Sequence, residues 1–215
     1  MIKQIYRVVI VANGKREEAI TKQIKRGDFI IGVDRAAFWL LEHGVIPDVA
    51  VGDFDSCKPG EFEKIKKNVS NVQSFSSEKD FTDTELALDV ALKKKPHEIV
   101  ILGGLGSRLD HTLGTVFLLE RCSRAHVAAS IQDEGNVVTL LIRGRTILEK
   151  REEYTYVSVI PVTDSIILSL EGFKYPLRRH MIHRGQTIGI SNEFISKQAM
   201  ITIHRGKALI IQSSD

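Results

Sequence analysis

The chain shows two different patterns of apolar and polar positions, and the change falls at about residue 130. In the first part, short apolar runs rich in Val and Ile have few polar interruptions, as strands buried on both faces of a parallel sheet require. We expect strands at residues 5–12, 28–34, 47–53 and 97–104.

The segments between these runs repeat their apolar residues at helical spacing. The segment 82–95, for example, begins with acidic residues and ends with basic ones, as the helix dipole favours. We expect helices at residues 35–44, 60–68, 82–95 and 109–125. Alternating strands and helices predict an α/β domain with a mostly parallel, doubly wound sheet over residues 1–130.

From residue 131 on, runs rich in Val, Ile and Thr follow one another with only turn residues between them. They cover residues 137–144, 154–162, 165–172, 186–191, 199–206 and 208–212. This spacing predicts an all-β C-terminal domain, residues 131–215, as an antiparallel sandwich, with a barrel as the alternative. The basic segment 178–184 is interpreted as an exposed turn, and a metal pair of His180 and His183 is the less favoured reading.

Composition and charge narrow the class of protein. Of the 215 residues, 43% are hydrophobic and 27% are charged, which suffices for a sizeable core. The net charge is +3 with scattered basic residues, which gives little support to nucleic acid binding and is compatible with a bound polyphosphate. No apolar run approaches the roughly 20 residues of a membrane span, and no signal peptide is evident. We therefore expect a cytoplasmic protein without membrane contact, whose Cys57 and Cys122 are ordinary reduced thiols.

Acidic residues follow the predicted strands at the end where ligands bind in open parallel sheets. Asp34 ends one strand, and Asp53 and Asp55 follow the next in the stretch GDFDS. Residues two apart in an extended segment face the same way, so this pair would converge on one cation. Magnesium is commonly held by one or two carboxylates plus substrate phosphates. The alternative is an acidic turn in which Asp55 or Ser56 caps the next helix.

The stretch KDFTDTE places further acids at a helix start. Thr82 and Glu85 have the capping-box spacing, which gives Glu85 a structural role. Asp80 and Asp83, three residues apart, would face the same site, with Asp83 as a metal ligand or as a base for a substrate hydroxyl. Lys79 would neutralise phosphate charge, unless it is a solvated surface residue.

The stretch GGLGSRLDHTLG is a candidate phosphate loop, although it matches neither the dinucleotide fingerprint nor the P-loop. Its glycines let a backbone approach phosphates, and they are Gly103, Gly104 and Gly106. Arg108 offers a planar donor fork, a helix start follows, and His111 is placed to touch a nucleotide. The alternative is a tight turn with Asp110 as N-cap and Arg108 exposed.

Taken together, these motifs resemble those of the thiamine pyrophosphokinase family, whose members transfer a diphosphate from ATP to thiamine. The similarity covers GVIPDVAVGDFDS, EKDFTDTELAL and GGLGSRLDHTLG in the first domain, and GFKYPL and GISNEF in the second, in the family's order. One departure is Arg35 and Ala36 after Asp34, where many members have two glycines.

The resemblance implies an N-terminal ATP-binding catalytic domain, a C-terminal β-sandwich that binds thiamine, and a homodimer. It implies that magnesium lies among Asp53, Asp55 and Asp83, with Asp34 and Asp110 close by. Arg108 and the adjacent glycines would hold ATP. Ser191 and Asn192 would shape the thiamine end, although their pattern alone favours a β-turn.

The reaction implied is attack by the hydroxyethyl oxygen of thiamine on the β-phosphorus of ATP, which releases AMP. Asp55 and Asp83 are the acids expected to act in it, and the sequence does not decide which is the base. Three rivals stay open: a phosphatase that uses the Asp-x-Asp of DFDS, diphosphate transfer to another hydroxymethyl heterocycle such as a pterin, and a non-catalytic sensor of nucleotide or thiamine.

Overall fold

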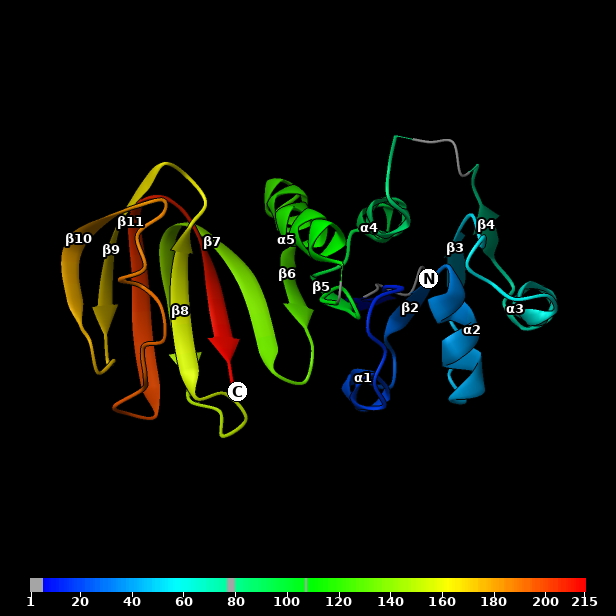
Figure 1. Ribbon diagram of the computed structural model, residues 1–215, viewed down its shortest axis with the longest axis horizontal. Helices are drawn as coiled ribbons and strands as arrows, with labels where there is room; N and C mark the ends of the chain where they lie inside the picture. Colours follow the sequence, from blue (N-terminus) through cyan, green and yellow to red (C-terminus); the bar gives the residue numbers. More distant parts are fainter. Residues whose placement is uncertain (1–5, 77–79, 107) are drawn as a thin grey trace. The chain divides into compact units, whose positions relative to one another are not determined.

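The computed structural model describes residues 6–76, 80–106 and 108–215. The chain divides into two compact units, here called the first unit (residues 1–133) and the second unit (residues 134–215). Figure 1 shows strands and helices mixed in the first unit and strands alone in the second.

The strands of the first unit are parallel and stand in the order β6-β5-β1-β2-β3-β4. Their bounds are β1 Arg7–Val11, β2 Phe29–Val33, β3 Val49–Gly52, β4 Val72–Ser74, β5 Glu98–Leu102 and β6 Ala128–Gln132. The central strands are buried on both faces, which explains their uninterrupted apolar runs.

Helices cover both faces of this sheet, α1 and α2 on one and α4 and α5 on the other (Figure 1). Their bounds are α1 Ala19–Gln23, α2 Arg35–Glu42, α3 Glu61–Asn68, α4 Asp83–Lys93 and α5 Leu109–Arg124. Val9 and Val11 of β1 pack with Ile20 and Leu40 in one apolar cluster under α1 and α2. The predicted doubly wound α/β class is therefore confirmed, while the short elements α1, β4 and β6 were not predicted.

The strand order creates a switch point between β1 and β5. From β1 the chain moves outward through β2, β3 and β4 on one side, and β5 and β6 then extend the sheet on the other side of β1. The connections that leave β1 and β5 therefore run in opposite directions, which opens a crevice at the carboxyl ends of these two strands.

The second unit is built from antiparallel strands, which confirms the predicted all-β class. Its strands are β7 Asn136–Glu149, β8 Tyr156–Pro161, β9 Ser165–Glu171, β10 Leu177–His183 and β11 Gln198–Ser213. The long strand β11 pairs with β7 on one edge, and with β9 and then β8 on the other. An irregularity between Ile203 and Lys207 separates the two halves of β11, and Gly206 there has φ 88°.

Three sequence interpretations in the second unit are wrong. Residues 186–191 form turns instead of a strand, because the two isoleucines that gave the alternation, Ile188 and Ile190, are exposed. Most of the segment 178–184 is the strand β10 instead of a turn, because its backbone pairs with β9 and Ile182 is fully buried. The separately predicted strands 199–206 and 208–212 are one strand, β11.

None of the helices in the described residues is both long enough and apolar enough to cross a membrane.

Candidate active site

A cavity of about 550 Å³ lies at the switch point of the first unit. The loops after β1, β2 and β5 and the first turns of α4 and α5 line it. Among the lining residues are Asn13, Lys15, Asp34, Asp83, Arg108 and His111. Polar groups from elements far apart in the sequence therefore meet at one edge of the sheet.

Two glycines bring the loops after β1 and β5 into backbone contact. The Gly14 amide donates to the Gly103 carbonyl at 3.1 Å, and the Ala12 amide donates to the Leu102 carbonyl at 2.8 Å. A Cβ on Gly14 would stand 2.3 Å from the Gly103 oxygen, and one on Gly103, whose φ is 64°, would stand 2.7 Å from the Ala12 oxygen. Only glycine fits at either position without moving a loop.

Gly104 and Gly106, the other two glycines of the loop after β5, lie on the cavity wall. A Cβ on Gly104 would meet Thr115 of α5 at 2.9 Å, so this glycine lets α5 approach the end of β5. The Gly106 amide donates to Thr112 Oγ1 at 3.2 Å. All three glycines predicted as phosphate-loop residues thus line the cavity, and their ligand role stays a prediction.

Asp34, the residue after β2, is held in an unusual conformation. Its φ and ψ are 51° and −130°, and its side chain is buried. Oδ2 accepts hydrogen bonds from Asn13 Nδ2 at 2.9 Å and from Ser56 Oγ. Oδ1 is buried and has no hydrogen-bond partner among the described residues.

The electrostatic surroundings of Asp34 disfavour its charged form. Burial raises the pKa of its carboxyl group, and the negative charges of Asp83 and Asp53 raise it further. The hydrogen bond from Ser56 and the backbone amide of Arg35 partly oppose this rise. The carboxylates predicted from separate motifs therefore lie close enough to repel one another.

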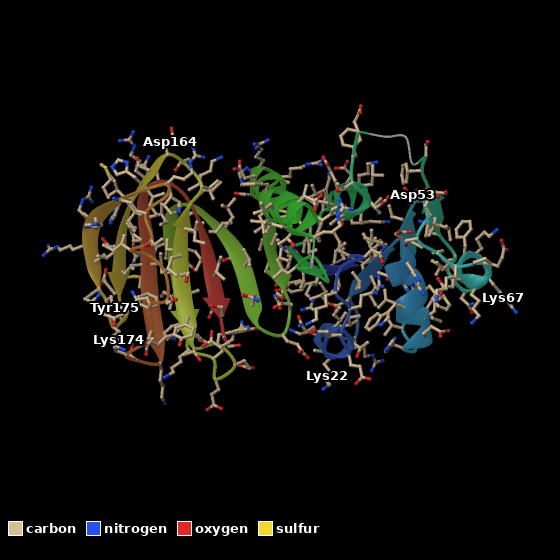
Figure 2. The ribbon with its side chains drawn as sticks, in the orientation of Figure 1. Lys22, Asp53, Lys67, Asp164, Lys174 and Tyr175 are labelled. Atoms are coloured by element: carbon tan, nitrogen blue, oxygen red, sulfur yellow. The ribbon has the colours of Figure 1, made fainter. Side chains whose placement is uncertain are left out.

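The GDFDS stretch begins at the last residue of β3 and turns at Asp55 and Ser56. Asp53 is labelled in Figure 2. Phe54, with φ 61°, buries its ring in a stack against Phe62 with centroids 4.6 Å apart. The Asp55 amide donates to Asp53 Oδ1 at 3.1 Å, and Asp55 itself is exposed. The two acids therefore flank an anchored aromatic ring, and neither is among the residues that line the cavity.

The start of α4 has the predicted cap. Thr82 Oγ1 accepts a hydrogen bond from the Glu85 amide at 3.2 Å, and Asp83 lines the cavity. The Glu85 carboxylate does not return to the cap but accepts from Arg121 Nη1 at 2.7 Å, which ties α4 to α5. Asp80 is exposed and outside the cavity lining. Lys79 lies outside the described residues.

Arg108 and Asp110 form an ion pair at the start of α5. Arg108 Nη2 lies 2.6 Å from Asp110 Oδ2, and Nε lies 3.2 Å from Oδ1. This pairing, with a further hydrogen bond from the His111 amide, lowers the pKa of Asp110 to about 2. Arg108 itself occupies the N-cap position and no side chain caps the helix, so Asp110 as N-cap is wrong.

The structure thus brings Asp34, Asp83, the glycine loop, Arg108 and His111 to one cavity, and leaves Asp53, Asp55, Asp80 and Asp110 outside its lining. No group of three or more His, Cys, Asp or Glu side chains in the described ranges is arranged to hold a metal ion. The sequence reading missed the loop Asn13–Lys15, although the dipeptide Asn13-Gly14 directly after the first strand was a usable turn signal.

Ser191 and Asn192 lie in the second unit, between β10 and β11. Ser191 has φ 55°, and its amide donates to Ser158 Oγ at 3.0 Å. Asn192 is buried: Oδ1 accepts from the Tyr175 and Glu193 amides, both at 3.0 Å, and Nδ2 donates to the Tyr175 carbonyl at 2.8 Å. The Asn192 side chain is therefore used to fix backbone, which is a positioning role.

Apolar surface surrounds Ser191. Ile188, Ile190 and Ile195 are 54%, 42% and 69% exposed. Tyr175 is also exposed and lies next to Lys174 (Figure 2), whose ammonium stands 5.6 Å from the centre of the Tyr175 ring. An exposed apolar and aromatic surface of this kind is a candidate for binding a ring-shaped ligand or another protein.

A polar cavity at the switch point of a doubly wound sheet places the first unit among the α/β proteins that bind ligands at this position. Two family models identify the two parts of the chain. Residues 20–131 match the thiamin pyrophosphokinase catalytic domain, and residues 145–210 match the thiamin pyrophosphokinase vitamin B1 binding domain. The chain belongs to the thiamine pyrophosphokinase family, as its motifs indicated, and its activity is that of this class of diphosphotransferase.

Individual relatives agree with this assignment. The chain is 39% identical over 186 residues to a thiamine pyrophosphokinase of Bacillus subtilis, an alignment that covers 86% of this chain and 87% of that protein. The crystal structure of the thiamine pyrophosphokinase from Bacillus subtilis superposes with a TM-score of 0.91 at 37% identity and covers 97% of this chain and 99% of that one. The structure from Geobacillus thermodenitrificans gives 0.88 at 36% identity, with 97% and 98% covered.

Proposed function

We propose that this enzyme transfers the β,γ-diphosphate group of ATP to the hydroxyethyl oxygen of thiamine in a magnesium-dependent reaction that yields thiamine diphosphate and AMP. The observation that carries the proposal is the cavity at the switch point, where glycine backbone, cationic side chains and carboxylates meet. We further expect the reaction to take place in the cytoplasm.

The polyphosphate would lie against the loops after β1 and β5. Their glycines carry no side chain that would hold a ligand away from the backbone at the carboxyl ends of the strands, and the N-terminus of α5 adds the positive end of its dipole. Arg108 and Lys15 are exposed cations on the cavity wall, so each can approach a phosphate from solvent. Arg108 would exchange its carboxylate partner Asp110 for a phosphate, which its planar fork fits equally well.

The residues present fit a divalent cation. Asp34 carries a buried oxygen without a partner among the described residues, and the charges of Asp53 and Asp83 act on it. We assign magnesium to the surroundings of Asp53, Asp55 and Asp83. One or two of these carboxylates would be direct ligands, since the substrate phosphates complete the shell of such an ion. When bound, the ion would offset the charge of the polyphosphate during transfer.

The acids have a second role toward the thiamine hydroxyl. Asp83 begins α4 on the cavity wall, where a carboxylate can accept the proton that the hydroxyl loses as it attacks. Asp55 is the other candidate, because it is exposed in the turn after β3, two residues beyond Asp53. Alignment of hydroxyl and phosphorus supplies much of the rate, and these side chains, together with Arg108, would hold both reactants.

The thiamine end is assigned to the C-terminal domain, residues 131–215, with Ser191 and Asn192 shaping the surface and isoleucines beside them. We propose a homodimer in addition. Its support within the first unit is an apolar stripe along α5, where Leu109, Leu113 and Phe117 are 67%, 48% and 56% exposed. Sedimentation equilibrium measures the assembly directly, and a monomer at assay concentration would contradict it.

The main test is the product analysis of a reaction with ATP, magnesium and thiamine. We expect AMP and thiamine diphosphate in equal amounts. ADP would indicate transfer of one phosphate, and free phosphate would favour the phosphatase. Binding without turnover would indicate a sensor. In a parallel reaction with a hydroxymethyl pterin in place of thiamine, product formation there and none with thiamine would favour the pterin rival.

Two variants assign the acids. Asp55→Asn and Asp83→Asn are each expected to lower kcat by at least about 100-fold, the loss typical of a removed acid–base or metal-binding group. Asp164→Asn, an exposed acid of the second unit, is the control and should keep wild-type turnover. Wild-type turnover in a folded Asp55→Asn or Asp83→Asn variant would remove that residue from the mechanism.

A third variant separates the two substrates. Ser191→Ala should raise the KM for thiamine while ATP binding, measured by isothermal titration, stays unchanged. Equal losses for both ligands would contradict the assignment of Ser191 to the thiamine end.

A further inference from the structure

Asn13, in the loop after β1, makes a set of contacts that connects three strand ends. Its Nδ2 donates to Asp34 Oδ2 at 2.9 Å and to Ser56 Oγ at 3.0 Å, and its Oδ1 accepts from Arg16 Nη1. Asp34 follows β2, and Ser56 belongs to the turn after β3. One amide thus holds side chains from the loops that surround the candidate active site.

The orientation of this amide is fixed by chemistry. The Arg16 guanidinium has donors only, so it must face the carbonyl oxygen of Asn13. The amino group of Asn13 is then directed toward the Asp34 carboxylate. An ionised carboxylate can only accept hydrogen bonds, so it needs a donor at this position. Arg16 therefore fixes which end of Asn13 meets Asp34.

The consequence for Asp34 is an asymmetric carboxylate. Asn13 and Ser56 both donate to Oδ2, whereas Oδ1 is buried without a partner among the described residues. The backbone is held as well, since the Asp34 amide donates to the Val51 carbonyl at 2.7 Å in spite of the positive φ. Strained, over-determined residues of this kind cluster at functional sites. An unsatisfied buried oxygen costs about 1–3 kcal/mol, so Asp34 is held in this position at a cost in stability.

We infer that Asn13 is a positioning residue which, with Ser56, holds the Asp34 carboxylate in the cavity wall, where this carboxylate accepts a hydrogen bond from an O–H group of a bound ligand. The inference rests on the proposed function, because that function puts a nucleotide there. The bound nucleotide offers two such groups: a hydroxyl of its ribose, and a water molecule on its magnesium ion. In dinucleotide-binding folds, an acid about 20 residues beyond the glycines of the first loop binds the ribose. Asp34 lies 20 residues beyond Gly14, so a contact with the ribose would follow the same arrangement.

The test is nucleotide binding by isothermal titration calorimetry, with AMP formation as a second readout. We expect Asn13→Ala to weaken ATP binding about 10-fold, and Ser56→Ala to weaken it less. Asn68→Ala is the matched control: it removes an amide of the same unit that bonds to the Lys64 carbonyl, and it should bind ATP as wild type does. The unfolding midpoint of each variant shows that the fold is kept.

A double-mutant cycle decides whether Asn13 acts through Asp34. Asn13→Ala should cost nothing further in an Asp34→Asn background, because the acceptor it positions is already altered. An equal loss in both backgrounds, or wild-type binding by Asn13→Ala alone, overturns the inference.

The two donors give different results. If the ribose donates, 2′-deoxy-ATP or 3′-deoxy-ATP binds wild type more weakly than ATP, and Asn13→Ala no longer distinguishes the deoxy nucleotide from ATP. If metal-bound water donates, the Asn13→Ala loss is present with magnesium and absent with EDTA. If wild-type protein binds ATP but forms no AMP, the proposed function is refuted, while the double-mutant cycle still tests the role of Asn13. If wild-type protein binds no ATP, the proposed function and the inference about Asn13 are both refuted.

Discussion

The contact between Gly14 and Gly103 makes a single methyl group a sharp probe of the switch point. In Gly14→Ala the new Cβ would stand 2.3 Å from the Gly103 carbonyl oxygen, and backbone on both sides prevents relief by a side-chain rotation. The loops after β1 and β5 must therefore separate. Separation also lengthens the 3.1 Å hydrogen bond between the Gly14 amide and that oxygen.

The cost follows from these two effects. Forcing a methyl group into a packed site costs about 1–3 kcal/mol, and a lost hydrogen bond adds about 1 kcal/mol. Replacing glycine lowers the entropy of the unfolded chain, which returns about 0.4–1 kcal/mol. The net loss is about 2 kcal/mol, and with a urea slope of about 2 kcal/mol/M for a unit of this size the midpoint should fall by about 1 M.

The assay is urea unfolding followed by tryptophan fluorescence. Trp39 is the single tryptophan of the chain. It lies on α2 and packs against the apolar cluster of the first unit, so the signal reports on this unit alone. Gly114→Ala is the matched control. Gly114 lies inside α5 with nothing within 4 Å of its new Cβ, so alanine should stabilise the helix by about 0.5–1 kcal/mol and raise the midpoint.

The same chemical change is thus expected to have opposite signs at two glycines. An unchanged midpoint in Gly14→Ala would show that the loops do not pack as described. A lower midpoint in Gly114→Ala would show that the new methyl group meets something, and would refute the claim that this helix face is open.

Three further outcomes follow from single contacts. Arg121→Met should lower the free energy of unfolding by about 1–2 kcal/mol by removing the partner of two carboxylates on α4, whereas Arg124→Met, a surface pair, should cost under about 0.5 kcal/mol; equal urea midpoints would contradict this. The lowered pKa of Asp110 means that its pairing with Arg108 stabilises the fold above about pH 4, and that this stabilisation is lost as the pH falls through about 2. In Arg108→Ala, the pKa of this carboxyl group, measured by NMR titration, should therefore rise to its ordinary range. Burial raises the pKa of the Cys57 thiol to about 11, so iodoacetamide should alkylate it about 100-fold more slowly at pH 8 than in urea-unfolded protein, and equal rates would show an accessible thiolate.

The fold class was predictable because the first unit is built from strands buried on both faces. Runs such as VVIV in β1 and IVIL in β5 allow few alternatives, and the helices between them carry their own start and stop signals. The elements that escaped prediction are short or partly exposed, as in β4, where no residue is buried. β11 was split into two strands because Gly206, which marks an irregularity within the strand, has the same sequence signal as a turn.

The candidate site was predictable in part for a different reason. The rule that ligands bind beyond the strand ends brought Asp34, Asp83 and the glycine loop to one edge without knowledge of the strand order. Asn13 was missed because its importance depends on β1, β2 and β3 being neighbours, which is a long-range property that no local pattern contains. Asp53 and Asp55 were expected in an extended segment, with an acidic turn as the alternative. The positive φ of Phe54 shows that the segment is not extended, and neither Asp55 nor Ser56 caps α3, whose N-cap is Gly60.

The pairing of β7 with β11 also bears on the order in which the chain folds during synthesis. β7 opens the second unit and β11 completes it, yet they pair along nearly their whole lengths, and β8 likewise pairs with β11 within this fully described unit. A ribosome that has delivered Gln132 has released every strand of the first unit, whereas β7 and β8 must wait without a partner in their own unit until residues 198–213 emerge. The nascent second unit therefore exposes its apolar strands longest, which makes it the part of the chain most dependent on chaperones and most sensitive to premature termination.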